Sequence, residues 1–240
     1  MEHLEDLVAA YRILAEYGVI DAYGHVSLRS PSNPQRYYLA RSLAPERVQL
    51  EDMIEYDLDS NPLDARGRES VTERFIHGEI FKVRPEVMAV VHNHSPSVVP
   101  FSVTGVPMRA LWHMAAFIGD GLPNWEIREV RKGTNLLVGD GVLGASLAKT
   151  LGSKPAALMR GHGSVTVGES LPRAVGRSVY LELSARMQMQ AMLLAGEKGN
   201  ITYMDDAEVK ASVPVQNYNR AWPMWREKAL ARAKAERGQQ

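Results

Sequence analysis

Three histidines and one glutamate carry the clearest chemical signal in this 240-residue chain. His92 and His94 form an H-x-H at the end of an apolar, β-branched run at residues 87–91, which is typical of a buried strand. Side chains alternate along a strand, so both imidazoles project to the same face, as two ligands of one metal ion must. The pair predicts a metal site where this strand ends.

Glu73 lies upstream of the pair in residues 71–84, whose apolar residues recur with a helical period. The apolar stripe of this predicted helix contains Ile76, Ile80 and Val83, and Glu73 lies on the same side. A carboxylate that faces a core is costly unless it is paired, hydrogen-bonded or beside a cation. A metal ion held by the histidine pair would be such a partner.

The third histidine lies between two glycines, in Gly161-His162-Gly163, directly after a short apolar strand predicted at residues 156–159. Glycines on both sides permit a close approach of the backbone to something bound there. A single histidine is more often structural than ligating, but here three neutral imidazoles and a carboxylate occur together. That set suits Zn²⁺, Mn²⁺ or a similar divalent ion with positions open for substrate.

The elements that must position these residues are helices alternating with short strands. With 45% hydrophobic and 23% charged residues, the chain is long enough for one large α/β domain over residues 1–240, with a C-terminal helical tail from about residue 213. We expect helices at residues 4–17, 141–151, 171–194 and after 223, and strands at residues 24–29, 36–39, 106–112, 136–139 and 156–159.

Composition excludes several classes of function. The 28 Lys plus Arg balance the 28 Asp plus Glu, so net charge gives no reason to expect nucleic acid or an anionic membrane as partner, and a small-molecule substrate is expected. The absence of cysteine excludes disulfides, thiolate metal ligands and cysteine nucleophiles. The acidic N-terminus lacks an apolar signal segment, and no run approaches a membrane span, so a cytoplasmic protein is expected.

The order of these motifs resembles the class II aldolase/adducin family. The resemblance covers roughly residues 4–195 and rests on Gly-x-Val-Ser-x-Arg at residues 24–29, Glu73 followed by His77, the H-x-H pair and the glycine-flanked histidine. It implies a three-layer αβα fold whose central, mainly antiparallel sheet is flanked by helices, and a homotetramer with active sites near subunit interfaces. It also implies His92, His94 and His162 as metal ligands and Glu73 as acid/base.

The chain departs from the sugar-phosphate aldolases of this family where they bind phosphate. They use an Asn in the first motif, a Ser/Thr-Gly pair in the next loop and a Ser-Ser pair before the Glu. This sequence has His25, Arg41-Ser42-Leu43 and Val71-Thr72 at those places. The segment from His94-Ser95-Pro96 to His113-Met114 is instead similar to the decarboxylase branch, whose members act on aromatic ortho-hydroxy dicarboxylates.

The sequence therefore favours a metal-dependent, non-oxidative decarboxylase of a hydroxylated aromatic dicarboxylate in aromatic catabolism. A metal-bound phenolic oxygen would be the electron sink, and Glu73 would donate the proton to the ring. The alternative is a class II aldolase that cleaves a hydroxy-aldehyde or a sugar phosphate. A non-catalytic assembly module, as in adducin heads, should lack the intact metal triad.

Substrate contacts are predicted at positions near the metal triad, each with a structural alternative. The candidates are His25 in the first motif, Thr72 before the Glu, His113, and the guanidinium groups of Arg41 and Arg160, which could pair with a carboxylate. Thr72 could instead begin the helix, His113 could be a core residue, and the two arginines could form surface or intersubunit ion pairs.

Overall fold

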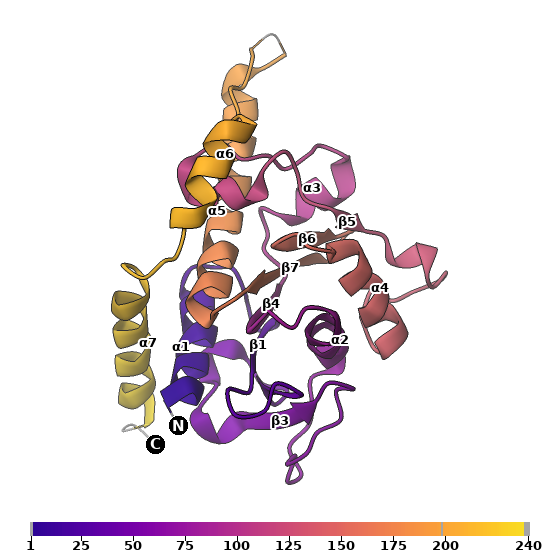
Figure 1. Cartoon of the computed structure of the whole chain (residues 1–240), viewed down its shortest axis with the longest axis vertical. Coiled ribbons are helices and arrows are strands. Elements are labelled where there is room, and N and C mark those ends of the chain that lie inside the picture. The colour runs from indigo at the N-terminus through magenta and orange to yellow at the C-terminus, as the bar shows by residue number, and fades with distance from the viewer. Residues whose placement is uncertain (1, 198, 238–240) are drawn as a thin grey trace.

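The computed structural model describes residues 2–197 and 199–237, and a seven-stranded sheet lies at its centre (Figure 1). The strands are β1 His25–Arg29, β2 Arg36–Ala40, β3 Met53–Asp57, β4 Ala89–Asn93, β5 Asn124–Trp125, β6 Ala156–Met159 and β7 Gly163–Gly168. Their order across the sheet is β3-β2-β1-β4-β7-β6-β5, and each neighbouring pair is antiparallel except the parallel pair β5 and β6. The predicted α/β class with a mainly antiparallel sheet is confirmed.

Helices cover both faces of this sheet (Figure 1). One face carries α1 Glu2–Glu16, α5 Leu171–Ala195 and α7 Trp222–Arg237, and the other carries α2 Phe75–Val83 and α4 Gly141–Leu151. Shorter helices, α3 Val99–Thr104 and α6 Asp206–Ser212, lie toward the β5 and β6 side, and 3-10 turns occur at 45–47, 50–52, 72–74, 113–118, 127–129 and 213–215. In the described part of the chain, no helix is both long and apolar enough to cross a membrane.

The central strands are buried on both faces because each face packs against its own helices. On one face, Val26 and Val91 pack with Leu7, Val175 and other residues of α1 and α5. Alternate residues of the same strands face α2 and α4, where Val90, Val165, Ile80 and Leu147 belong to a second apolar cluster. Two covered faces explain why the strands have nearly continuous apolar runs.

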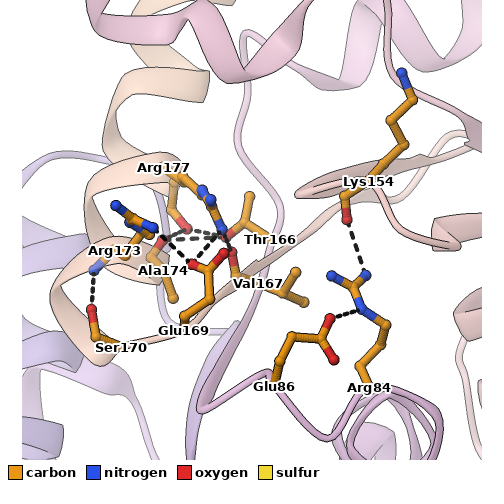
Figure 2. Close-up of polar contacts among 11 residues, drawn as sticks. Arg84, Glu86, Lys154, Thr166, Val167, Glu169, Ser170, Arg173, Ala174 and Arg177 are labelled. Atoms are coloured by element: carbon orange, nitrogen blue, oxygen red, sulfur yellow. Dashed lines mark hydrogen bonds and ion pairs between the residues drawn. The ribbon is translucent and has the colours of Figure 1, made fainter. Parts of the chain in front are cut away.

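The start of α5 is fixed by polar contacts at the end of β7 (Figure 2). Ser170 caps the helix by accepting a hydrogen bond from the backbone N–H of Arg173, and Arg173 and Arg177 both form ion pairs with Glu169. On the neighbouring loop, Arg84 pairs with Glu86 and donates to the carbonyl of Lys154 at 3.3 Å. These contacts hold α5 and the α2–β4 turn against the same end of the sheet.

Two strand predictions were wrong. Residues 106–112 and 136–139 are irregular, although Val138 is buried. Both runs are apolar because they pack beneath neighbouring elements, and periodicity cannot distinguish such packed loops from short strands. Residues 72–74, predicted as the first turn of a helix, form a 3-10 turn in which Glu73 has non-helical torsions (φ −88°, ψ 20°) before α2 begins.

The glycines around His162 serve backbone geometry. Gly161 has a φ of +64°, which the turn between β6 and β7 requires, and Gly163 lies against the neighbouring strand. A Cβ at position 163 would lie 1.9 Å from the carbonyl oxygen of Asn93. The close approach predicted from these glycines therefore exists at Gly163, but the partner there is the backbone of β4.

Replacing Gly163 with alanine is expected to destabilise the protein by about 1–3 kcal/mol, because the β-carbon would force β4 and β7 apart. Urea denaturation followed by circular dichroism measures this change. Gly139→Ala is the matched control, since nothing lies within 4 Å of a Cβ there. Equal stabilities for the two variants would contradict the proposed constraint.

Candidate metal centre and adjoining pocket

Glu73, His92, His94 and His162 converge at one point of the structure. One candidate ligand atom from each side chain lies within 4.8 Å of those of the other three. His92 belongs to β4, His94 follows that strand, and His162 lies in the turn before β7, so antiparallel pairing of the two strands brings the three imidazoles together. Glu73 reaches the cluster from the 3-10 turn ahead of α2.

The spacing within the cluster fits a shared divalent ion. Nε2 of His94 lies 3.1 Å from Nε2 of His162, and Oε2 of Glu73 lies 3.5 Å from Nε2 of His92 and 3.6 Å from Nε2 of His162. Ligands about 2.0–2.1 Å from a tetrahedral ion are about 3.3 Å apart, and these distances bracket that value. The donor set therefore fits Zn²⁺ or another ion that accepts imidazole nitrogen.

His92 is oriented so that its free lone pair faces the cluster. Its Nδ1 lies 3.2 Å from the carbonyl oxygen of Ser164, and because a carbonyl only accepts, Nδ1 must carry the proton. Nε2 is then unprotonated, and it is buried without a hydrogen-bond partner. A backbone carbonyl that fixes the tautomer of a ligating histidine is a common feature of metal sites.

Glu73 is held as a carboxylate. Its Oε1 accepts a hydrogen bond of 2.9 Å from the backbone N–H of Val138, which directs Oε2 toward the imidazoles. Burial alone would raise the pKa of Glu73, but in the metal-free cluster His92 and His162, when they carry a proton, outweigh burial and hold the pKa below its ordinary value. A carboxylate in this place can accept a proton before it donates one.

The loop after His94 is anchored by a second buried carboxylate. Glu182 of α5 accepts hydrogen bonds from the hydroxyls of Ser95 and Ser97 and from the backbone N–H of Ser97. Asn93 accepts from the Ser95 N–H and from the Ser164 hydroxyl, which ties the loop to β7. The positions of His94 and His162 are thus linked through side chains that do not enter the cluster.

A pocket of about 380 Å³ opens beside the cluster. His25, Thr72, Glu73 and His94 supply its polar side chains together with Ser42 and Tyr23, and its other lining residues are Ala22, Gly24, Leu43, Ala44, Val71 and Leu137. No lysine or arginine is among these described lining residues. The pocket therefore offers imidazole and hydroxyl groups and apolar walls, but no permanent cation of its own.

The predicted substrate contacts divide into two groups. His25 and Thr72 line the pocket with Glu73 and His94. Arg41 pairs with Asp52 at 2.6 Å, Arg160 makes a two-pronged pair with Glu126 at 2.9 and 3.1 Å, and neither lines the pocket. His113 is exposed and borders a separate cavity of about 610 Å³ with residues of the C-terminal segment, such as Tyr218 and Met224. The structure thus brings His25 and Thr72 to the pocket beside the cluster, and the roles of Arg41, Arg160 and His113 stay predictions.

Sequence reasoning missed two contributors to this region. Val138, placed in an expected strand, donates its N–H to Glu73 from a loop, and no pattern in the sequence marks that donor. His77, which the sequence offered only as part of the motif that begins with Glu73, is fully buried, and its Nε2 lies 2.6 Å from Nδ1 of His25. His77 follows Glu73 by four residues, the spacing of neighbours on one face of a helix. This spacing could have predicted that His77 lies near the site.

Comparison with known proteins identifies relatives of this chain. Residues 5–189 match the model of the class II aldolase and adducin N-terminal domain. The chain belongs to this family. It is 32% identical to decarboxylase tropJ of Talaromyces stipitatus, over 91% of this chain and 90% of that protein, and 28% identical to 3,4-dihydroxyphthalate decarboxylase of Arthrobacter keyseri over the same shares.

Members of the class II aldolase and adducin family also share this fold among solved structures. L-fuculose 1-phosphate aldolase of Glaciozyma antarctica superimposes with a TM-score of 0.76 at 24% identity, covering 98% of this chain and 90% of that one. The predicted resemblance to the family and its decarboxylases is confirmed. Decarboxylases and aldolases both break carbon–carbon bonds, so the prediction of a carbon–carbon lyase is confirmed at that level.

The cluster is expected to hold one divalent ion per chain. Replacing His162 with asparagine removes one of the three imidazoles and should weaken zinc affinity at least about 100-fold, because ligand loss costs more than loss of a second-sphere contact. Competition against a zinc-binding dye gives the affinity, and mass spectrometry of the dialysed protein gives the stoichiometry. His113→Asn, at an exposed histidine, should behave as the parent; equal affinities for both variants would contradict the assignment.

His77 should make the metal-free protein sensitive to acid. Burial, followed by the nearby His92, lowers the pKa of His77 to about 3, whereas an unfolded histidine titrates near 6.5. The native state thus binds fewer protons between these values, so stability falls as pH drops from about 6.5 toward 3, by up to about 1.4 kcal/mol per pH unit. Urea denaturation in EDTA at several pH values should give a shallower dependence for His77→Gln than for the parent or for His113→Gln.

Proposed function

We propose that this protein is a metal-dependent, non-oxidative decarboxylase of a hydroxylated aromatic acid whose carboxylate lies ortho to a phenolic hydroxyl. The observation that carries the proposal is the pocket beside the cluster, which combines apolar walls with neutral polar groups and lacks a lysine or arginine among its described lining residues. The relative named 3,4-dihydroxyphthalate decarboxylase has a substrate of this class in its name.

The same pocket is poorly suited to a phosphate. A phosphate dianion is usually bound by arginine or lysine or by several converging backbone N–H groups. Arg41 and Arg160, the nearest candidates from the sequence, are each engaged by a carboxylate. Leu43, Ala44, Val71 and Leu137 offer surfaces that suit the face of an aromatic ring better than a phosphorylated sugar.

Proton transfer in the proposed reaction centres on Glu73. As an ionised carboxylate, it takes the proton of the phenolic hydroxyl and delivers it to the ring carbon that bears the carboxylate. The bond to the carboxylate carbon then breaks, CO₂ leaves, and the bonding electron pair moves through the ring to the ortho oxygen, which takes a proton from solvent. The ring proton is retained, and the net reaction consumes one proton.

The chain's other residues orient the substrate for this transfer. Val138 holds Glu73 by one oxygen, so the second oxygen remains available at the cluster. A divalent ion held by His92, His94 and His162 would, when bound, act as a Lewis acid that stabilises the negative charge developing on the ortho oxygen. His25 and Thr72 lie where they can hydrogen-bond the substrate's carboxylates.

The proposal is tested by measuring CO₂ release from the protein loaded with Zn²⁺ or Mn²⁺. The panel should contain 3,4-dihydroxyphthalate, other ortho-hydroxy aromatic acids and isomers whose hydroxyl is meta to the carboxylate. Release is expected only from ortho-hydroxy acids. Failure to release CO₂ from any of them, or formation of dihydroxyacetone phosphate from L-fuculose 1-phosphate, would overturn the proposal in favour of an aldolase.

Replacing Glu73 with glutamine should lower kcat about 10²- to 10⁴-fold, the range that a general acid/base contributes. Zinc should remain bound through the three histidines, so metal content separates a chemical defect from loss of the ion. Glu129→Gln, at an exposed carboxylate, is the control and should keep parent activity. A Glu73→Gln enzyme with full kcat and a full complement of metal would remove Glu73 from the mechanism.

We further propose a zinc or manganese enzyme that works in the cytoplasm as a homotetramer in aromatic catabolism. Metal analysis of protein purified without added metal identifies the ion. Light scattering after size exclusion gives the mass of the assembly.

A further inference from the structure

Three buried polar side chains form a hydrogen-bonded chain that leads away from the pocket. Nδ1 of His25 lies 2.6 Å from Nε2 of His77, and Nδ1 of His77 lies 2.6 Å from Oγ of Ser27. His25 and Ser27 project to one face of β1, and His77 meets them from α2. Ser27 and His77 are fully buried, and His25 is 5% exposed where it borders the pocket.

Both imidazoles of the chain are neutral. Both rings are buried, and neither has a carboxylate among its hydrogen-bond partners in the described residues, so a proton added to either would be a buried charge without a counter-ion. A neutral imidazole has one N–H donor and one lone pair. A chain of two such rings and one hydroxyl therefore has two possible directions of donation.

The hydroxyl of Ser27 decides between these directions. Its only hydrogen-bond partner among the described residues is Nδ1 of His77. If Nδ1 of His77 carried the proton, the serine hydrogen would have no acceptor in a fully buried place, and such an orphaned donor is strongly disfavoured. If the serine donates, Nε2 of His77 donates to Nδ1 of His25, and every member of the chain is satisfied.

We propose that Ser27 and His77 are positioning residues that fix His25 as an Nε2–H donor directed at a negatively charged oxygen of the substrate. With Nδ1 accepting from His77, the single proton of His25 must be on Nε2, the nitrogen left for the pocket. The identity of that oxygen, a carboxylate of an aromatic acid, rests on the proposed function. The tautomer itself does not.

A fixed donor has a chemical purpose in this pocket. The described lining residues include no lysine or arginine, so a substrate carboxylate must find neutral donors. An unconstrained imidazole can present either its N–H or its lone pair, and the lone pair would repel a carboxylate. The buried serine removes that second state and supplies specificity for an acceptor without placing a charge beside the cluster.

The tautomer can be measured without reference to activity. Magic-angle-spinning ¹⁵N spectra of histidine-labelled, zinc-loaded protein distinguish protonated from bare ring nitrogens, and the His25→Gln and His77→Gln variants assign the two signals by subtraction. We expect both histidines to be protonated at Nε2 and bare at Nδ1. A bare Nε2 on His25, or a doubly protonated ring, would overturn the proposal even if the protein proves to be a decarboxylase.

Kinetics of three variants test the functional consequence. His77→Gln keeps an amide N–H for His25 and a carbonyl for Ser27, so KM should stay within about threefold of the parent, whereas His77→Phe removes both and should raise KM about tenfold with kcat changed less than about threefold. Ser27→Ala should raise KM several-fold and show mixed His25 tautomers. Ser30→Ala, another buried serine beside β1, is the matched control.

KM values are compared only between variants whose melting temperature and zinc content match those of the parent, so a change in KM reports on the positioning of His25. Equal KM values for His77→Phe and His77→Gln would show that the chain only fills space and would refute the positioning role. If no aromatic acid is decarboxylated, the proposed function fails, while the ¹⁵N spectra still decide the tautomer.

Discussion

The close pairing of β4 with β7 is the constraint on which the candidate metal centre depends. His92 belongs to β4, His94 follows the end of that strand, and His162 lies in the turn before β7, so the imidazoles meet only if the two backbones approach closely at that point. Gly163 permits this approach because any side chain there would overlap the carbonyl of Asn93. The helices on both faces then keep the pair in place, and the Asn93–Ser164 hydrogen bond and the Glu182 carboxylate secure the loop that carries His94.

The electrostatics of the centre follow from this packing. Three imidazoles and one carboxylate share a largely buried volume, and the carboxylate is the only anion among the four groups. Its pKa is held down by His92 and His162 even though burial opposes ionisation, and one of its oxygens is occupied by the Val138 N–H. Glu73 lies in the 3-10 turn before α2, where its backbone torsions are non-helical. The result is a carboxylate next to a candidate site for a cation.

Much of the fold could be predicted because its elements have strong local signals. The helix at 141–151 and the strand at 156–159 have the bounds expected from periodicity, and α5 differs by one residue at its end. The convergence of Glu73 with the three histidines could also be anticipated, because alternation along a strand and the resemblance to a family both pointed to it.

The predictions that failed were strands at 106–112 and 136–139. These are short apolar segments without regular structure, and their burial comes from tertiary contacts that a sequence does not display. Charged residues were the other difficulty. Whether Arg41 or Arg160 meets a ligand or a carboxylate of its own chain depends on Asp52 and Glu126, which are distant from them in sequence.

The candidate metal ligands and the pocket wall come from different parts of the fold, so the pocket can change while the ligands are kept. The ligands are fixed by strand ends, whereas the pocket wall comes largely from loops, in which Leu43, Ala44, Val71 and Leu137 can vary without disturbing β4 or β7. His25 is the exception, because it belongs to β1 and pairs in register with His92. A polar side chain built into the sheet must have its hydrogen bonding satisfied from within the core. For His25, His77 of α2 supplies this contact and is itself bonded to Ser27 of β1. A histidine in the first motif is therefore more than a local exchange of one polar residue for another. In this chain it has a buried partner on α2, which in turn bonds a hydroxyl two residues further along β1.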